Sequence, residues 1–196
     1  MYDGLGTIQQ LNLDYVKRMG YTSLRCTWDP GCPGEMRPAR DLSWDEDPWG
    51  VRDAYVRAYG AIFAEPVARS SGEAETDATI EVPTIVGAPC CAQFAVSRSQ
   101  VLLTPLTRFE RARQWLWESA PELPAAVSGR VMEYIWHLLF GMDAVSCPDT
   151  AGCFCQGWGL CDLKCPEEGW CEGRYWRTVF GMGWNEKWPV EGQGVK

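Results

Sequence analysis

The most strongly patterned segment of the chain holds three side chains whose types and spacing suit acid–base chemistry. Arg130, Glu133 and His137 follow one another at intervals of three and four residues, which places them on one side of a helix. A carboxylate four residues before an imidazole can orient the ring and raise its pKa, so that the ring serves as a general acid or base. An arginine one turn earlier can hold an anionic group. We therefore predict a catalytic trio with His137 as the acid/base, and a network that merely pins the helix to a neighbour is the alternative.

A second, weaker pattern lies in the acidic loop at 41–50. Asp45 and Asp47 are separated by one residue, and two such carboxylates can bind a divalent cation, Mn or Mg, through hard oxygen ligands. The spacing is similar to the Asp-x-Asp element of nucleotide-sugar transferases. No apolar strand precedes the pair, and acidic loops commonly face water. The pair is a candidate metal site, with a solvated loop as the alternative.

Cysteine is unusually frequent: there are ten in 196 residues, and six of them lie between positions 147 and 171. That segment is rich in Gly, Pro, Asp and Trp and shows little periodicity, so it cannot bury enough apolar surface to hold itself together. Covalent bridges or a metal must stabilise it. We predict disulfides at Cys26, Cys32, Cys90, Cys91, Cys147, Cys153, Cys155, Cys161, Cys165 and Cys171.

Zinc and free thiols are the alternatives for these cysteines. Structural zinc sites usually contain C-x2–4-C or H-x3–5-H pairs. Only Cys161 and Cys165 have a suitable gap, and His137 is the only histidine in the chain. The pairing of the cysteines stays open at this stage, because ten of them allow hundreds of connectivities.

Composition restricts the partners and the compartment. A net charge of −8 argues against nucleic acid, since contacts to phosphates need clustered Lys and Arg. No apolar run is long enough to span a bilayer, and no signal peptide is visible after Met1. Disulfides nevertheless indicate an oxidising location, so we expect the secretory pathway or the extracellular space. The sequence does not indicate an oligomeric state.

Eleven tryptophans are many for this length, and several lie near Gly or Pro. Exposed indoles beside carboxylates can form platforms on which sugar rings stack, so carbohydrate is a candidate partner. Filling of a small core is the alternative. The tryptophans near Gly or Pro are Trp28, Trp49, Trp158, Trp170, Trp184 and Trp188.

Periodicity predicts an α+β fold: a small mixed sheet with three to four helices and a cysteine-rich, disulfide-stapled C-terminal lobe. Thr107 and Glu110 have the spacing of a capping box, and Phe109, Ala112 and Leu116 are predicted to form the inner stripe of the helix that follows. We expect one domain over 1–172 and a loosely ordered tail over 173–196. The predicted helices are 8–19, 51–63, 107–119 and 128–140, and the predicted strands are 21–26 and 89–96.

Several long and unusual strings are similar to the C-terminal part of a mainly fungal family, domain of unknown function 3431. They are YTSLRC (21–26), WDPGCP (28–33), CCAQFAVSR (90–98), SGRVMEYIWHLLFG (128–141), and the Cys-Pro, Cys-Phe-Cys and Gly-Leu-Cys strings within 147–161. The resemblance covers the chain from about Leu11 to Cys161.

The resemblance implies a protein of the secretory pathway, because members of the family look secretory or membrane-anchored. The family's upstream part resembles a nucleotide-sugar transferase domain, and we expect it to be missing from this chain. The resemblance therefore implies a glycosyltransferase-like protein that acts on or binds carbohydrate. A non-catalytic, secreted, disulfide-rich binding or structural module is the alternative, and the missing upstream part favours it.

Overall fold

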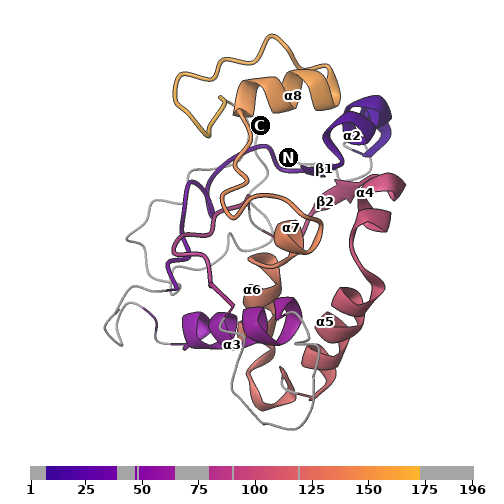
Figure 1. Ribbon diagram of the computed structural model, residues 1–196. Helices are drawn as coiled ribbons and strands as arrows, with labels where there is room; N and C mark the ends of the chain where they lie inside the picture. The colour runs from indigo at the N-terminus through magenta and orange to yellow at the C-terminus, as the bar shows by residue number, and fades with distance from the viewer. Residues whose placement is uncertain are drawn as a thin grey trace, which may run out of the picture.

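A computed structural model describes residues 8–38, 47, 49–64, 80–89, 91–118 and 120–172 of the chain (Figure 1). Its elements in chain order are α2 (Leu13–Met19), β1 (Tyr21–Ser23), α3 (Val51–Phe63), β2 (Phe94–Val96), α4 (Arg98–Leu103), α5 (Leu106–Glu118), the 3₁₀ helix η1 (Ala120–Glu122), α6 (Ala125–Glu133), α7 (Trp136–Leu139) and α8 (Thr150–Trp158). The predicted α+β class is confirmed. The predicted tail over 173–196 lies outside the described residues.

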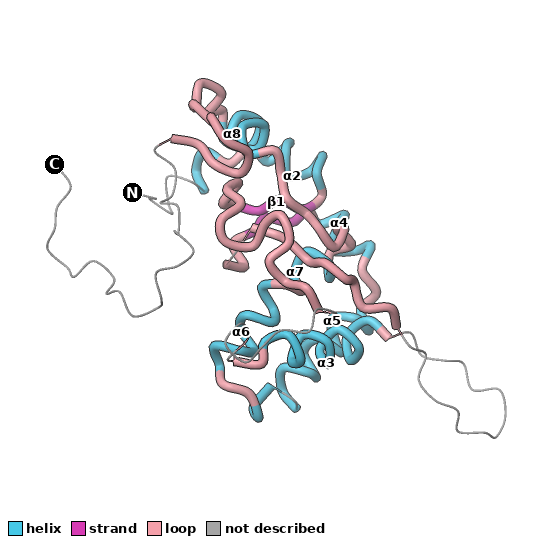
Figure 2. Tube along the Cα trace, turned by 90° about the vertical axis from the view of Figure 1, so that its left-hand side faces the viewer, coloured by secondary structure: helices cyan, strands magenta, loops and turns pink. Residues whose placement is uncertain are grey.

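The elements form two ends joined by a small sheet. Figure 2 shows α2 and α8 at one end, α3, α5 and α6 at the other, and β1 between them. Strands β1 and β2 pair antiparallel, with Tyr21 opposite Val96 and Ser23 opposite Phe94. The sheet thus brings residues near the start of the chain beside the segment that leads into α4.

Isolated backbone bridges of both directions extend this central region. Met36 pairs antiparallel with Val86, and Gly87 pairs parallel with Val145. The segment that contains Gly87 also approaches the segment that contains Pro33 closely. A Cβ atom on Gly87 would lie 2.6 Å from the carbonyl oxygen of Pro33. Only glycine lets the three segments meet at this distance.

The larger hydrophobic core lies between α3, α5 and α6. In α3, Ala54, Tyr55, Ala58 and Ile62 recur at helical spacing and are at most 1% exposed. They pack against residues of α5 and α6, among them Trp115 and Val131. The chain therefore holds its helical end together by ordinary apolar burial.

The C-terminal lobe is held together differently. Its core is a small cluster of buried residues in which sulfur predominates: Cys26, Cys153, Phe154, Trp158 and Cys171. Bridges join Cys26 to Cys153, Cys32 to Cys147, Cys155 to Cys161, and Cys165 to Cys171. The predicted disulfide-stapled lobe is confirmed. Cys91 is also disulfide-bonded, and Cys90 lies outside the described residues.

Three predicted helices differ in detail from those observed, and both predicted strands, 21–26 and 89–96, are shorter in the structure. The helix predicted over 8–19 is interrupted at residues 11 and 12, because the side chain of Asn12 caps α2. The helix predicted over 128–140 is divided into α6 and α7. At the break, the backbone N–H groups of Tyr134 and Ile135 donate to carbonyl oxygens only three positions earlier in the chain. Both of these residues are buried, at 6% and 0% exposure.

The inner face of α5 also differs from its predicted stripe. Ala112 and Trp115 are buried there, whereas Leu116 is 40% exposed. The helix begins at Leu106, so Thr107 is its second residue and not its cap. The buried face of α5 is decided by tertiary packing, because α3 packs on the side of Ala112 and Trp115 and not on the side of Leu116.

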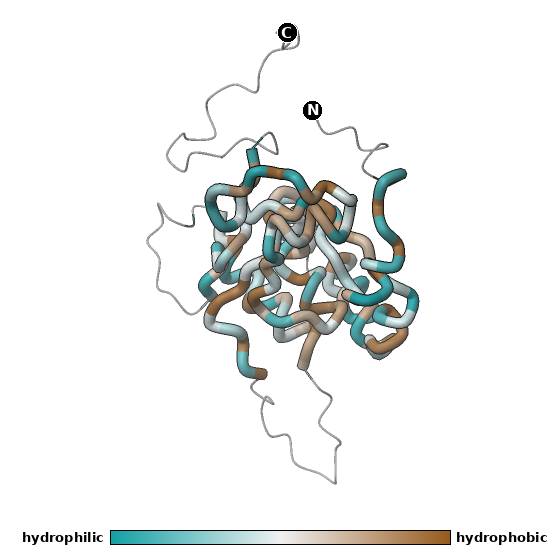
Figure 3. The backbone as a smooth tube through the Cα atoms, turned by 90° about the horizontal axis from the view of Figure 1, so that it is seen from above, coloured by the Kyte–Doolittle hydropathy of each residue, from teal (hydrophilic) through white to brown (hydrophobic). Residues whose placement is uncertain are grey.

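Hydrophobic and hydrophilic stretches alternate over short lengths along the described chain, as Figure 3 shows from above. Within the described ranges, no helix has both the length and the apolar character needed to cross a bilayer.

The losses of unfolding free energy on removing the two long-range bridges, Cys26–Cys153 and Cys32–Cys147, should not be additive. Replacing Cys26 and Cys153 by serine should lower the unfolding free energy by about 3 kcal/mol, because Cys32–Cys147 still closes the long loop and only the short stretches 26–32 and 147–153 are released. Replacing all four cysteines also opens a loop of more than a hundred residues, and the total loss of about 8 kcal/mol approaches the stability of a whole domain. Urea unfolding monitored by circular dichroism measures both.

The local bridge between Cys165 and Cys171 is the matched control. It closes a loop with a sequence separation of 6, so its removal should cost about 2 kcal/mol. A four-cysteine variant that unfolds at the same urea concentration as the two-cysteine variant would contradict the proposed role of the long-range bridges.

Candidate functional site

Arg130 and Glu133 lie together in the structure, as predicted, and a third charged residue joins them. The Arg130 guanidinium donates from Nη1 to Glu133 Oε2 at 2.7 Å and from Nη2 to Glu35 Oε1 at 2.8 Å. The same guanidinium lies 5.2 Å from the ring centroid of Tyr134. These four side chains join the loop after β1 to the end of α6.

The charges of this group largely satisfy one another. Burial by itself lowers the pKa of Arg130, but Tyr134, Glu35 and Glu133 together outweigh that effect and the pKa is raised. Burial, and then the neighbouring Glu35, raise the pKa of the Tyr134 phenol. An anionic ligand at Arg130 would have to compete with two carboxylates that are already bound there.

His137 lies apart from this group, in the interior. Its side chain is fully buried, and Nε2 lies 3.2 Å from the backbone oxygen of Ala144. Nδ1 is buried and has no hydrogen-bond partner among the described residues. Burial lowers the pKa of His137 to about 4, although the Ala144 carbonyl acts in the opposite direction. The imidazole is therefore uncharged near neutral pH.

The break between α6 and α7 explains why the predicted pairing of Glu133 with His137 does not form. The two residues belong to different helices, so the four-residue spacing no longer brings them over one another. Glu133 pairs with Arg130, and the imidazole turns toward the loop that contains Ala144. The structure thus brings two of the three predicted catalytic residues together and places the third in the core.

Of the predicted metal-binding pair, Asp47 is described and Asp45 lies outside the described residues. Asp47 accepts the backbone N–H of Val51 at 2.9 Å and that of Arg52 at 3.1 Å, so it caps the start of α3. In the part of the chain that the structure describes, no three His, Cys, Asp or Glu side chains gather as a metal site. The eight cysteines in the four named bridges are bonded to one another, and a bonded sulfur does not ligate zinc as a thiolate.

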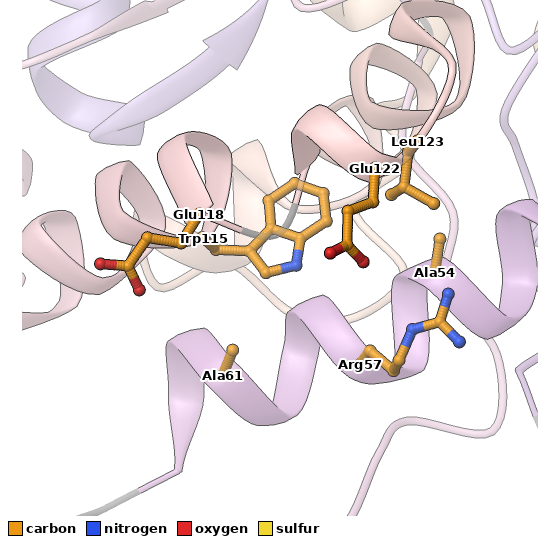
Figure 4. Close-up of a pocket in the computed structure, with 7 residues that line it drawn as sticks. All are labelled: Ala54, Arg57, Ala61, Trp115, Glu118, Glu122 and Leu123. Atoms are coloured by element: carbon orange, nitrogen blue, oxygen red, sulfur yellow. The ribbon is translucent and has the colours of Figure 1, made fainter.

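A cavity of about 580 Å³ lies between α3, α5 and η1 (Figure 4). It is lined by Ala54, Arg57, Ala61, Trp115, Glu118, Glu122 and Leu123. We call it the Trp115 cavity.

Trp115 is 4% exposed, yet it forms part of the cavity wall. Its indole N–H has no acceptor among the described residues. Figure 4 shows the nitrogen-bearing edge of the ring on the side where the Glu122 carboxylate lies. The indole nitrogen is reached by solvent through the cavity, so the N–H is free to donate to a ligand oxygen there.

The remaining polar groups of the cavity come from three elements and carry both signs of charge. Arg57 projects from α3, Glu118 ends α5, and Glu122 belongs to η1. Glu118 accepts a hydrogen bond from Gln114 at 2.9 Å. Within the described ranges, neither Arg57 nor Glu122 makes an ion pair or a side-chain hydrogen bond. The cavity thus offers donors, acceptors and apolar wall atoms to one ligand.

The sequence interpretation did not identify this cavity. It singled out tryptophans near Gly or Pro, and those that the structure describes have varied surroundings. Trp28 donates to the Pro148 oxygen at 2.6 Å, Trp158 is buried, and Trp49 is 66% exposed. Trp184 and Trp188 lie outside the described residues. The only local signal for the cavity was Trp115 three residues before Glu118 on a predicted helix.

The family model for Protein of unknown function (DUF3431) matches residues 1–156. The chain belongs to this family. The resemblance stated from its sequence strings is thereby confirmed. No curated protein and no solved structure matches the chain.

The DUF3431 match contains all residues of the Trp115 cavity and both long-range disulfides. It ends within α8, so the bridge between Cys165 and Cys171 lies beyond it. The cavity and the covalent closure therefore both belong to the part of the chain that defines it as a DUF3431 protein.

The burial of His137 should make the DUF3431 fold sensitive to acid. An unfolded imidazole takes up a proton below about pH 6.5, whereas the folded one does so only near pH 4. The unfolding free energy should therefore fall as the pH drops from about 6.5 to about 4, by about 3 kcal/mol from this group, and should not respond to it above that window.

Urea unfolding at pH 7, 5.5 and 4 tests this, with a His137→Gln variant as the comparison. The difference in stability between the two proteins isolates His137 from the carboxyl groups that titrate in the same range. We expect the wild-type protein to lose about 3 kcal/mol relative to the variant across the window. If the unfolding free energies of the two proteins fall in parallel as the pH drops, His137 is not the source of the acid sensitivity.

Proposed function

We propose that this protein is a disulfide-stabilised module that binds carbohydrate in the Trp115 cavity and resides in the secretory pathway or the extracellular space. One observation carries the proposal. The indole N–H of a nine-tenths buried tryptophan, without an acceptor among the described residues, belongs to the wall of a cavity that also holds an uncommitted guanidinium and an uncommitted carboxylate.

The cavity suits a polyhydroxylated ligand for physical reasons. Its volume of about 580 Å³ falls within the range of small-molecule sites, about 300–1,000 Å³. A sugar hydroxyl accepts from an indole N–H or a guanidinium and at the same time donates to a carboxylate. The apolar wall atoms of Ala54, Ala61 and Leu123 can contact the C–H faces of a sugar ring.

The disulfides support the proposed location. Four named bridges in one small chain are typical of proteins that mature in an oxidising compartment. Structural disulfides of this kind are rare where glutathione keeps thiols reduced.

We rank binding above glycosyl transfer, for which the sequence provided Arg130, Glu133 and His137. An imidazole that is enclosed and uncharged near neutral pH has no route to a substrate. Arg130 is already engaged by Glu35 and Glu133. The binding proposal requires no divalent cation, and transfer assisted by Mn or Mg at Asp45 and Asp47 stays the alternative.

Arg57→Ala and Glu122→Gln should each weaken oligosaccharide binding about tenfold, because each removes a charged hydrogen-bonding partner. Trp115→Phe keeps the ring and removes the N–H, so it should weaken binding about fivefold. A glycan array identifies the ligand, and isothermal titration calorimetry measures its Kd. Unchanged melting temperatures confirm that each variant is folded.

Arg113→Ala and Glu110→Gln are the matched controls, because both residues are exposed on α5 and neither lines the cavity. They should leave the Kd unchanged. The proposal fails if no oligosaccharide binds, or if the control variants lose as much affinity as the cavity variants.

Glycosyl transfer is tested separately with sugar nucleotides in the presence of Mn²⁺. We expect the same background release of nucleoside diphosphate from the wild-type protein, from His137→Gln and from a blank. Turnover by the wild-type protein that disappears in a folded His137→Gln variant would favour transfer over simple binding.

A further inference from the structure

We propose that the Trp115 cavity selects carbohydrate that carries protonated amino groups, such as oligomers of an unacetylated hexosamine. This inference rests on the proposed function and specifies its ligand class. It follows from the charges of the wall, from their placement around Trp115, and from the charge of the whole chain.

The wall is predominantly anionic. It contains the two carboxylates of Glu118 and Glu122 and one guanidinium, that of Arg57, so its formal charge is −1. Glu122 has no cationic partner within the described ranges, and the one hydrogen bond that Glu118 accepts comes from an uncharged amide. Both carboxylates are therefore available to a cation.

The carboxylates are arranged around the indole. In Figure 4 the Glu118 and Glu122 side chains lie on opposite sides of Trp115, and Arg57 lies beyond Glu122 on the facing helix. A ligand that crosses the indole edge meets one carboxylate on each side. An oligomer with amino groups on more than one sugar unit can pair with both carboxylates.

The energetics favour an amine over the uncharged and acidic alternatives. A hydroxyl forms a neutral-donor hydrogen bond to a carboxylate, whereas an ammonium forms a charge-assisted one that is roughly twice as strong. An acidic sugar would pair with Arg57 but would be repelled by both carboxylates. It would also approach a chain of net charge −8, which attracts cationic ligands and repels anionic ones.

Isothermal titration at pH 6 with four probes tests the inference. They are β-1,4-linked tetramers of glucosamine, of N-acetylglucosamine and of glucose, and the linear polyamine spermine. We expect the glucosamine tetramer to bind with a one-to-one stoichiometry and at least tenfold more tightly than the other three. Spermine separates recognition of an amino sugar from attraction of any polycation.

Variants of the cavity wall test which side chains produce the preference for the glucosamine tetramer. Glu122→Gln and Glu118→Gln should each reduce the advantage of the glucosamine tetramer over its acetylated counterpart about fivefold, and Glu110→Gln on the same helix should leave it unchanged. Arg57→Ala should increase the advantage, because it removes the only cation of the wall.

The outcomes separate the two proposals. If the three tetramers bind equally well and the cavity variants weaken them, carbohydrate binding stands and amine selection is wrong. If spermine binds as tightly as the glucosamine tetramer, or if Glu110→Gln has the same effect as Glu122→Gln, amine selection is also overturned. If none of the tetramers binds, the inference fails and the array decides whether any carbohydrate is bound.

Discussion

Two covalent bridges, Cys26–Cys153 and Cys32–Cys147, close the chain on itself, and the rest of the structure is built on that closure. They fix the loop after β1 against α8 and the segment that leads into it. Backbone pairing between Met36 and Val86 and between Gly87 and Val145 then becomes possible in the same region. Without crosslinks, the lobe would depend on a cluster of five buried residues, of which three are cysteines. So small an apolar cluster does not offset the entropy of ordering such a chain.

The helical end is stabilised by apolar packing instead of disulfides, and the candidate site lies at the edge of this packed region. Alanines and aromatic residues of α3 pack closely against α5 and α6. Trp115 lies at the margin of that core, where the space between α3, α5 and η1 forms the cavity (Figure 4). Its ring is held rigidly by the core while its N–H edge belongs to the cavity wall. A rigid aromatic group beside adjustable charged side chains is a common arrangement in ligand-binding sites.

The conspicuous titratable residues of α6 and α7 contribute to architecture in this structure. Arg130 links α6 to Glu35, which lies 95 positions earlier in the chain, and His137 supports the loop around Ala144. The carbonyl of Ala144 also accepts the N–H of Gly87. His137 is therefore part of the junction that the disulfides create, and its enclosure makes the stability of the fold depend on acid pH.

The sequence by itself determined the features that arise from local pattern and composition: the disulfide-stabilised lobe, the α+β class, the DUF3431 family, and helices close to α3 and α5. Amphipathic spacing and cysteine density are properties of short segments, so they can be recognised in the sequence before the fold is known. Only the tertiary structure decided the partners of the cysteines, the break that separates His137 from Glu133, and the meeting of Arg57 with Trp115 and Glu122. These depend on which helix faces pack together across the chain, because packing between distant segments leaves no signature in the local spacing of residues.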